Sequence, residues 1–228
     1  MDNQEMAELL AAILPTRRRP VAVRYASNGR EPGERLTACE GLLRASAGET
    51  IRLSARRLSC PLGAVRLGLV APNSPADQAM PGRLELAREP QTCSVTEPGA
   101  LDPAPPFSAP QGQRIVMAPL GSAAAELVVF ICTMAEAARL MAWASGMTGA
   151  APRITMEGAT CHRAIALPLS TGKPNVTLLS RLARETRGYA FDEILVTLPY
   201  ARCVEMLAEH RRTRQPALSP KPMPQGAI

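Results

Sequence analysis

Two cysteines of this 228-residue chain stand just before short apolar segments that are typical of helix starts. Cys60 lies in the stretch SCPLGA and Cys161 in the stretch ATCHRA. At a helix start a side chain meets free backbone N–H groups and the positive end of the helix dipole, and both favour thiolate over thiol. Thiolate is the form of cysteine that attacks electrophiles and binds metals. The pattern therefore predicts a reactive or ligand-binding site at one or both cysteines.

The residues around Cys60 predict its place in the helix. Pro61 suits the first helical position, where the missing N–H costs nothing, so Cys60 is expected at the N-cap. Gly63 leaves room for the close approach of a ligand. Two interpretations stay open from these residues: Cys60 is a ligand or nucleophile, or it is a buried cap.

Two further residues are candidates for this site. His162, one of two histidines in the chain, follows Cys161. Neighbouring side chains on a helix diverge by about 100°, so the two rarely share one metal. Cys39 opens a predicted short helix and is a candidate member of a thiol cluster, whereas Cys132, at the end of an apolar run, is expected to be a buried hydrophobe.

Known catalytic and cofactor motifs are absent from the sequence. It contains no Cys-x-x-Cys, Gly-x-Gly-x-x-Gly, His-Glu-x-x-His or Gly-x-Ser-x-Gly pattern. The run from Ser170 to Lys173 has the letters of a phosphate loop but lacks its upstream glycine, and predicts a tight turn. Arg184 offers a bidentate contact to a carboxylate or phosphate. Asp192 and Glu193 are either a general acid and base or a solvated strand edge.

The composition limits the classes of partner. The chain is 46% hydrophobic, which suffices for a sizeable core, and its net charge is +6. That charge favours either an anionic partner or an arginine-rich solvated surface. Aromatic residues make up only 3% and do not alternate with the arginines, so nucleic acid is disfavoured as a partner. A small-molecule or cofactor ligand is expected instead, and a homo-oligomer is compatible with the sequence.

The distribution of apolar residues predicts a cytoplasmic protein. No run of 18 or more apolar residues is present, so no membrane span is expected. The start, MDNQE, lacks the basic and apolar parts of a signal peptide. The six cysteines are then expected to be reduced, as metal ligands, reactive thiols or buried hydrophobes rather than disulfides.

Hydrophobic periodicity predicts one α/β domain with a mixed sheet over residues 1–211. Strand, helix, strand, thiol and helix occur in this order twice, which suggests two pseudo-repeated β-α-β-α halves. The proline-rich residues 71–113 are expected to form a surface excursion or lid, and residues 212–228 a disordered tail. The expected helices cover residues 3–14, 38–47, 134–147 and 203–211, and Thr133 with Glu136 is expected to form the capping box of the helix over 134–147. The expected strands cover residues 21–25, 51–58, 115–118, 126–131, 153–156, 175–179 and 193–198.

The order of several short motifs resembles that of the family called domain of unknown function 169, the uncharacterised ArCR proteins of archaea and bacteria. The resemblance covers about residues 5–210. The motifs that carry it are, in chain order, Pro20-Val21-Ala22-Val23, Cys39, Ser59-Cys60-Pro61-Leu62-Gly63-Ala64 with Leu67-Gly68, Ile115-Val116-Met117-Ala118-Pro119-Leu120, Glu126-Leu127-Val128-Val129-Phe130, residues 135–141, Gly158-Ala159-Thr160-Cys161, Gly172-Lys173-Pro174-Asn175-Val176-Thr177-Leu178, and Asp192-Glu193 through Leu198-Pro199-Tyr200.

The resemblance implies a single α/β domain and a shared thiol-lined site, since recurring family cysteines match Cys39, Cys60 and Cys161. It brings no settled activity. Members usually carry one more cysteine, in a Gly-Cys-x-Gly-x-Arg stretch, where this chain has Ser180. An acidic residue usual in the family is replaced by Arg163. A four-cysteine iron–sulfur cluster is therefore disfavoured, and a three-thiolate metal site or a pocket without metal fits better.

Three functions compete on this evidence. In the first, Cys39, Cys60, Cys161 and Gly63 line a site for a cofactor, metal or small molecule, and Arg184 and His162 lie near it. In the second, Cys60 or Cys161 is the nucleophile of an enzyme that acts on an electrophilic small substrate. In the third, the cysteines only cap helices in a structural or assembly protein.

Overall fold

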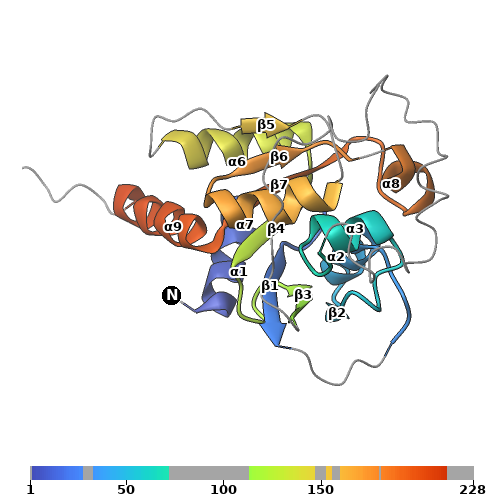
Figure 1. Ribbon diagram of the computed structural model, residues 1–228. Coiled ribbons are helices and arrows are strands. Elements are labelled where there is room, and N and C mark those ends of the chain that lie inside the picture. Colours follow the sequence, from blue (N-terminus) through green and yellow to red (C-terminus); the bar gives the residue numbers. More distant parts are fainter. Residues whose placement is uncertain are drawn as a thin grey trace, which may run out of the picture.

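The computed structural model describes residues 2–27, 33–71, 113–146, 153–155, 160–179 and 181–214. These residues form helices and strands in alternation (Figure 1). In chain order the elements are α1 (Asn3–Ile13), β1 (Val21–Ser27), α2 (Ala38–Ser46), β2 (Ile51–Leu53), α3 (Pro61–Arg66), β3 (Gln113–Pro119), β4 (Leu127–Thr133), α6 (Met134–Gly146), β5 (Arg153–Thr155), the π-helix η1 (His162–Ala166), α7 (Leu167–Thr171), β6 (Asn175–Thr177), α8 (Arg181–Thr186), β7 (Glu193–Pro199) and α9 (Tyr200–Arg214).

The seven strands form one sheet in the order β2-β3-β1-β4-β7-β6-β5. All neighbouring strands are antiparallel except β5 and β6, which are parallel. The sheet is therefore mixed, and the predicted α/β domain with a mixed sheet is confirmed. The two pseudo-repeated halves stay a prediction. Helix α9 continues past residue 211, where the tail was predicted to begin, and residues 215–228 lie outside the described part of the chain.

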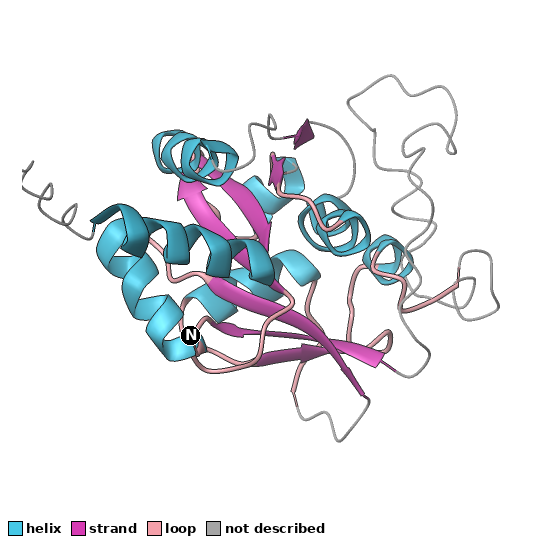
Figure 2. Cartoon of the chain, turned by 90° about the vertical axis from the view of Figure 1, so that its left-hand side faces the viewer, coloured by secondary structure: helices cyan, strands magenta, loops and turns pink. Residues whose placement is uncertain are grey.

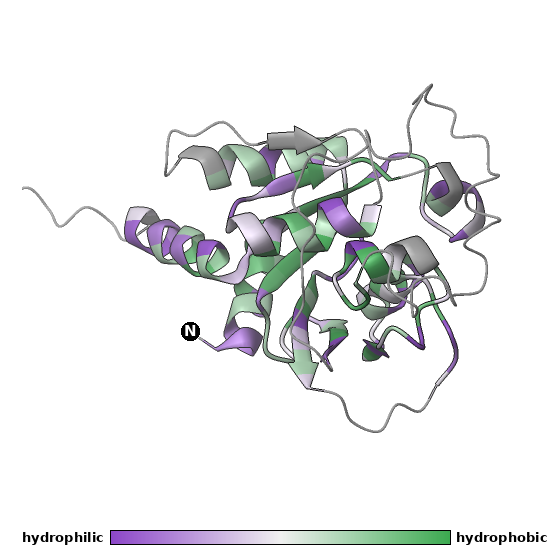
Figure 3. Ribbon diagram, in the orientation of Figure 1, coloured by the Kyte–Doolittle hydropathy of each residue, from purple (hydrophilic) through white to green (hydrophobic). Residues whose placement is uncertain are grey.

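Helices cover both faces of the sheet and create two apolar cores (Figures 1 and 2). Helix α2 packs on β1, β2 and β3, while α6 and α9 pack on β4 and β7. Apolar residues gather along the central strands, as the green ribbon of Figure 3 shows. The first core lies on the face of α2 and includes Val23, Leu42, Ile115, Cys161 and Leu195; the second core lies on the other face and includes Met6, Phe130, Cys132, Leu140, Val196 and Cys203.

The predicted strand 51–58 is wrong beyond Leu53. Strand β2 pairs with β3 only over Ile51–Leu53, and the chain then turns. Leu36 holds the segment after the turn, because its N–H donates to the carbonyl of Arg57 and its carbonyl accepts from Ser59 N, both at 3.0 Å. The backbone groups that a longer strand would have paired are thus used by a distant segment.

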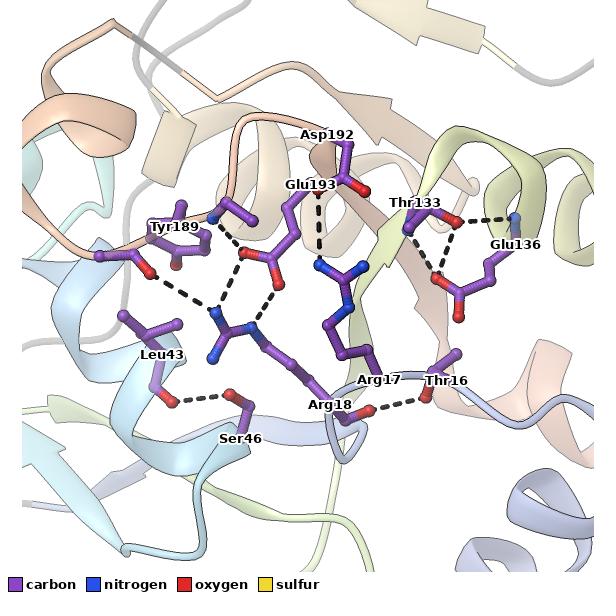
Figure 4. A network of polar contacts seen from close by, with 12 residues as sticks. Thr16, Arg17, Arg18, Leu43, Ser46, Thr133, Glu136, Tyr189, Asp192 and Glu193 are labelled. Carbon is purple, nitrogen blue, oxygen red and sulfur yellow. Dashed lines mark hydrogen bonds and ion pairs between the residues drawn. The ribbon is translucent and has the colours of Figure 1, made fainter.

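The start of α6 agrees with its prediction, whereas the run from Ser170 to Lys173 differs from it. Thr133 and Glu136 form the expected capping box at the start of α6: Glu136 N donates to Thr133 Oγ1 at 3.3 Å, and Thr133 N donates to Glu136 Oε2 at 2.6 Å (Figure 4). Gly172, at a φ of +63°, ends α7, so Ser170 and Thr171 are the last residues of a helix. The predicted tight turn is therefore wrong for these two residues, and the chain leaves the helix only at Gly172. The predicted excursion at 71–113 falls almost wholly on residues 72–112, outside the described part of the chain.

A buried ion pair ties the segment before β1 to the start of β7 (Figure 4). Arg18 Nε and Nη2 donate to the two oxygens of Glu193, at 2.5 and 3.2 Å, and Ala190 N donates to Glu193 Oε2 at 2.7 Å. Glu193 is only 1% exposed. The interpretation of Glu193 as part of a solvated strand edge is therefore wrong, whereas a general acid or base role stays a prediction. Asp192 is half-exposed and lies 3.5 Å from Arg17.

Among the helices that the structure describes, none has the length and apolar character that crossing a bilayer requires.

Candidate functional site

Cys60 occupies the N-cap of α3, as predicted. Its Sγ accepts a hydrogen bond from Gly63 N at 3.3 Å, and Pro61 fills the first helical position. The extended backbone of Cys60, with φ −103° and ψ 107°, turns the chain into the helix. The sequence Cys-Pro-x-Gly thus produces a cap in which sulfur takes the part usually played by oxygen.

Cys39 lies in the first turn of α2. Thr37 caps that helix in a capping box with Glu40, so Cys39 lies at a fixed position over the sheet. Tyr189 donates its hydroxyl hydrogen to the carbonyl oxygen of Cys39 at 2.7 Å, which links α2 to the segment before β7. The Thr160 hydroxyl also hydrogen-bonds the Cys39 thiol. Cys39 is thereby joined to the segment that carries Cys161.

Cys161 directly precedes η1, a five-residue π-helix. π-helical turns are rare and are often found at functional sites. Two buried side chains hold this turn on the sheet: Thr197 donates to the carbonyl of Ala164 at 2.8 Å, and Asn175 Nδ2 donates to the carbonyl of Arg163 at 3.0 Å. Strands β6 and β7 therefore fix the position of Cys161.

The structure brings Cys39, Cys60 and Cys161 together. A Cβ added to Gly63 would lie 3.5 Å from the Sγ of Cys60 and 3.7 Å from the Sγ of Cys161. Cys39 and Cys60 both raise the pKa of Cys161 through charge repulsion, and Cys60 does the same to Cys39, so the third sulfur lies within electrostatic reach of the other two. We call these three residues the thiol cluster. It lies on the face of the first core, drawn from α2, the start of α3 and the residue before η1.

Two further cysteines lie on the opposite face of the sheet. Cys132 and Cys203 are 1% and 0% exposed and belong to the second core. The prediction that Cys132 is a buried hydrophobe is confirmed. The sheet separates both residues from the thiol cluster.

Burial makes two members of the cluster neutral thiols. Burial raises the pKa of the Cys39 thiol to about 12, with a smaller increase from Cys60 and a decrease from Arg187. Burial also raises the pKa of Cys161 well above its ordinary value, although the backbone N–H groups of Cys161 and His162 lower it. The prediction of a thiolate at Cys161 is therefore wrong: the loss of water around the sulfur outweighs the favourable N–H groups.

Two tyrosines near the cluster were not predicted from the sequence. Tyr25 donates to the carbonyl of Leu67 at 2.7 Å, and burial together with the neighbouring Cys161 raises the pKa of its phenol. Tyr189, 5% exposed, has a pKa raised by burial and then by Cys39. The alternation of β1 does place Tyr25 on the same face as Val21 and Val23. The alternation identifies the face of the sheet on which Tyr25 lies, but it does not indicate that Cys161 packs on the same face.

Arg184, a predicted site residue, makes its described contacts in the loop before β7. Arg184 donates to the carbonyls of Ala190 and Phe191, and its guanidinium carbon lies 5.8 Å from the centre of the Phe191 ring. These contacts place its charge in the loop before β7. The side chain of His162 is 2% exposed.

Metal ligands are not assembled in the described residues, since no three or more His, Cys, Asp and Glu side chains there are arranged to hold a metal ion. Ser180, where relatives were expected to carry a cysteine, lies outside the described part of the chain. The thiol cluster therefore has sulfur neighbours without the geometry of a ready metal centre.

Comparisons with known proteins give one match. No curated protein and no solved structure matches the chain. A family model described as DUF169, uncharacterised ArCR, matches residues 9–209. The match spans all described elements from the second half of α1 to most of α9, including the three cysteines of the cluster. The chain therefore belongs to the DUF169 family of uncharacterised ArCR proteins.

Proposed function

We propose that this protein binds a small molecule with a soft, thiol-reactive or strongly polarisable group, and that Cys39, Cys60 and Cys161 contact it. The observation that carries the proposal is that two sulfurs from segments about a hundred residues apart in the chain face the same bare Cα, that of Gly63. The third thiol, Cys39, raises the pKa of Cys161, and Cys60 raises the pKa of Cys39.

The protonation of the cluster indicates the kind of ligand. Neutral thiols are polarisable and apolar, so they contact soft groups well without presenting a charge. Cys39 and Cys60 are partly exposed, whereas Cys161 is 7% exposed, so a ligand would reach the cluster from the side of Cys39 and Cys60. The absence of a side chain on Gly63 leaves the space that such a group would enter.

A molecular ligand is favoured over a bare metal ion. Zinc and iron–sulfur sites need ligands placed at defined distances, and the described residues contain no such group. A metal would also have to displace protons from Cys39 and Cys161, whose pKa values burial raises. We therefore propose the uncharged thiols, rather than a preformed metal centre, as the binding groups.

Phenylarsine oxide tests the proposal directly. The arsenic forms two As–S bonds with neighbouring thiols and releases its oxygen and their two protons as one water. In a Cys93→Ser background, intact-mass measurement under native conditions is expected to show one arsenic per chain. Cys60→Ser and Cys161→Ser should each abolish this adduct.

The matched control is the pair of buried thiols on the opposite face of the sheet. A Cys132→Ser, Cys203→Ser variant is expected to keep the adduct, because both side chains lie in the second core. An adduct that survives Cys60→Ser, or one that forms only in denaturant, would contradict the proposal. Zinc or cadmium titration of the same variants tests the metal version, and tight binding that is lost with Cys39→Ser would establish that version instead.

A cysteine nucleophile at Cys60 is the second candidate. One observation favours it: the Gly63 N–H donates to the Cys60 sulfur, a contact that stabilises thiolate. The rate of Cys60 alkylation by iodoacetamide as a function of pH separates the two candidates. A midpoint well below the ordinary thiol value of about 8.5 supports the nucleophile, and a midpoint above it supports binding alone.

A further inference from the structure

Three arginines project from adjacent strands onto one face of the sheet. In the pairing register Arg24 of β1 and Arg52 of β2 both lie opposite Val116, which is in the middle strand β3. Arg114 precedes Val116 by two positions and so points to the same face. Neighbouring strands are about 4.8 Å apart, so long arginine side chains around Val116 are within reach of one small ligand. We call Arg24, Arg52 and Arg114 the arginine triad.

The alternation along each strand identifies this face. Val23 and Ile115 belong to the first core, so their neighbours Arg24 and Arg114 point the other way. Ala22, two residues before Arg24, lies in the second core. The triad is therefore on the opposite side of the sheet from the thiol cluster.

Helices α1, α6 and α9 lie on this face, and Met6 and Leu10 of α1 share the second core with Ala22, near the start of β1. Helices α6 and α9 pack on β4 and β7, whereas α2 packs on β1, β2 and β3 from the face of the first core. In Figure 2 the lower ends of the strands extend beyond the stacked helices. Of the three arginines, Arg52 is exposed, whereas Arg24 and Arg114 are partly buried.

The triad has positive charge and hydrogen-bond donors without acceptors. No ion pair joins Arg24, Arg52 or Arg114 to a described carboxylate, and Arg24 Nε and Arg114 Nε and Nη1 are shielded from solvent with no hydrogen-bond partner. Glu126 directly precedes β4, one residue beyond the pair Val23–Leu127, and its Oε2 accepts from Tyr25 N at 2.7 Å. Shielded guanidinium N–H groups without acceptors are unfavourable, so an anion would complete the site.

We propose that the arginine triad binds the phosphate group of a small molecule. Guanidinium groups recognise phosphate through paired N–H donors, and three of them match the charge and the several oxygens of a phosphate better than a single carboxylate. This site is independent of the thiol cluster, because the two lie on opposite faces of the sheet. A small ligand is favoured over a polynucleotide because the triad is compact and aromatic residues for base stacking are scarce.

Calorimetric titration with inorganic pyrophosphate tests the site. Saturable binding to the full chain is expected, with affinity that falls as salt rises. Arg52→Gln, at an exposed side chain, and Arg114→Gln should each weaken binding at least tenfold, and Arg114→Lys should restore part of it. Arg139→Gln, an exposed charge on α6, is the matched control and should leave binding unchanged, as should Cys60→Ser.

Three results would overturn the proposal. The first is the absence of saturable binding. The second is an equal loss in Arg52→Gln and Arg139→Gln, which would indicate general charge attraction. The third is binding of single-stranded DNA without binding of pyrophosphate, which would assign the face to a polymer. Circular dichroism of each variant separates these results from a failure to fold.

Discussion

The sulfur atoms of Cys60 and Cys161 both face the Cα of Gly63, 3.5 and 3.7 Å from the position that a Cβ would take there. Cys60 also caps the helix that contains Gly63 and accepts its N–H. The helix start therefore determines the space between the two sulfurs as well as the orientation of one of them. A substitution at Gly63 can therefore fill the space between the two sulfurs while every cysteine is kept.

Gly63→Ala is expected to fold normally and to lose the arsenic adduct. The added methyl would make ordinary van der Waals contacts at 3.4–3.7 Å, and alanine is favoured over glycine in a helix by up to about 1 kcal/mol. The free energy of unfolding should therefore stay equal or rise slightly. The rate of adduct formation should fall at least tenfold, because the methyl occupies the space between the sulfurs.

Gly41→Ala provides the contrast for this experiment. A Cβ at Gly41 would lie 3.0 Å from the Met117 sulfur, away from the cluster but in a tight part of the first core. That variant should lose stability and keep the adduct. If Gly63→Ala forms the adduct at the wild-type rate, the space beside Gly63 is not the binding site.

Alkaline pH should destabilise the protein through its buried thiols. Burial raises the pKa of Cys39 from 9.0 to about 12, so the folded state favours the neutral thiol. This contribution is complete below pH 9 and is lost as the pH rises from 9 toward 12, at up to about 1.4 kcal/mol per pH unit for one group. Urea unfolding should show that the free energy of unfolding falls by about 1 kcal/mol between pH 8 and pH 10 because of Cys39.

Cys39→Ala isolates that contribution. Cys132 and Cys203, whose pKa values are also raised to about 12, remain in the variant and keep their share of the pH dependence. The difference in the free energy of unfolding between the wild type and the variant should therefore become smaller as the pH rises. If the difference in the free energy of unfolding between the two proteins is independent of pH, the pKa of the Cys39 thiol is not raised in the folded protein.

Removing one member of the Arg18–Glu193 pair should be costly. Glu193 is 1% exposed and Arg18 is a quarter exposed, so either single change leaves a buried charge or donor without its partner. Arg18→Met is expected to lower the free energy of unfolding by about 3 kcal/mol in urea titration. The double variant Arg18→Met, Glu193→Leu should recover much of the loss. A double variant as unstable as the sum of the single variants would show that Arg18 and Glu193 are not energetically coupled, which contradicts this prediction.

Local signals in the sequence predicted most elements and only part of the site. The Thr-x-x-Glu pattern gave the cap at Thr133, and Cys-Pro-x-Gly gave the cap at Cys60, because capping depends on residues only a few positions apart. The resemblance to the family, rather than spacing, indicated that Cys39 joins Cys60 and Cys161. The thiolate prediction failed because the pKa of Cys161 depends on the core packed around it.

Contacts between residues that are far apart in the chain could not be predicted from the sequence. Arg18 and Glu193 are far apart in the chain, and nothing in either local pattern indicates the partner. The arginine triad likewise arises from the register of β1, β2 and β3, and a shift of one residue would send one arginine to the opposite face. Alternation predicts which residues share a face within one strand, but it does not predict which strands become neighbours.

Thr197→Val should disturb the cluster from a distance. The Thr197 hydroxyl, 0% exposed, donates to the carbonyl of Ala164 in the π-helix that follows Cys161. Valine keeps the shape but leaves that carbonyl without its donor, at a cost of about 1–3 kcal/mol in the free energy of unfolding. The turn should relax, and the arsenic adduct should form more slowly as Cys161 moves. Thr197→Ser keeps the hydroxyl and should keep the adduct rate, so equal rates in the two variants would show that β7 does not position Cys161.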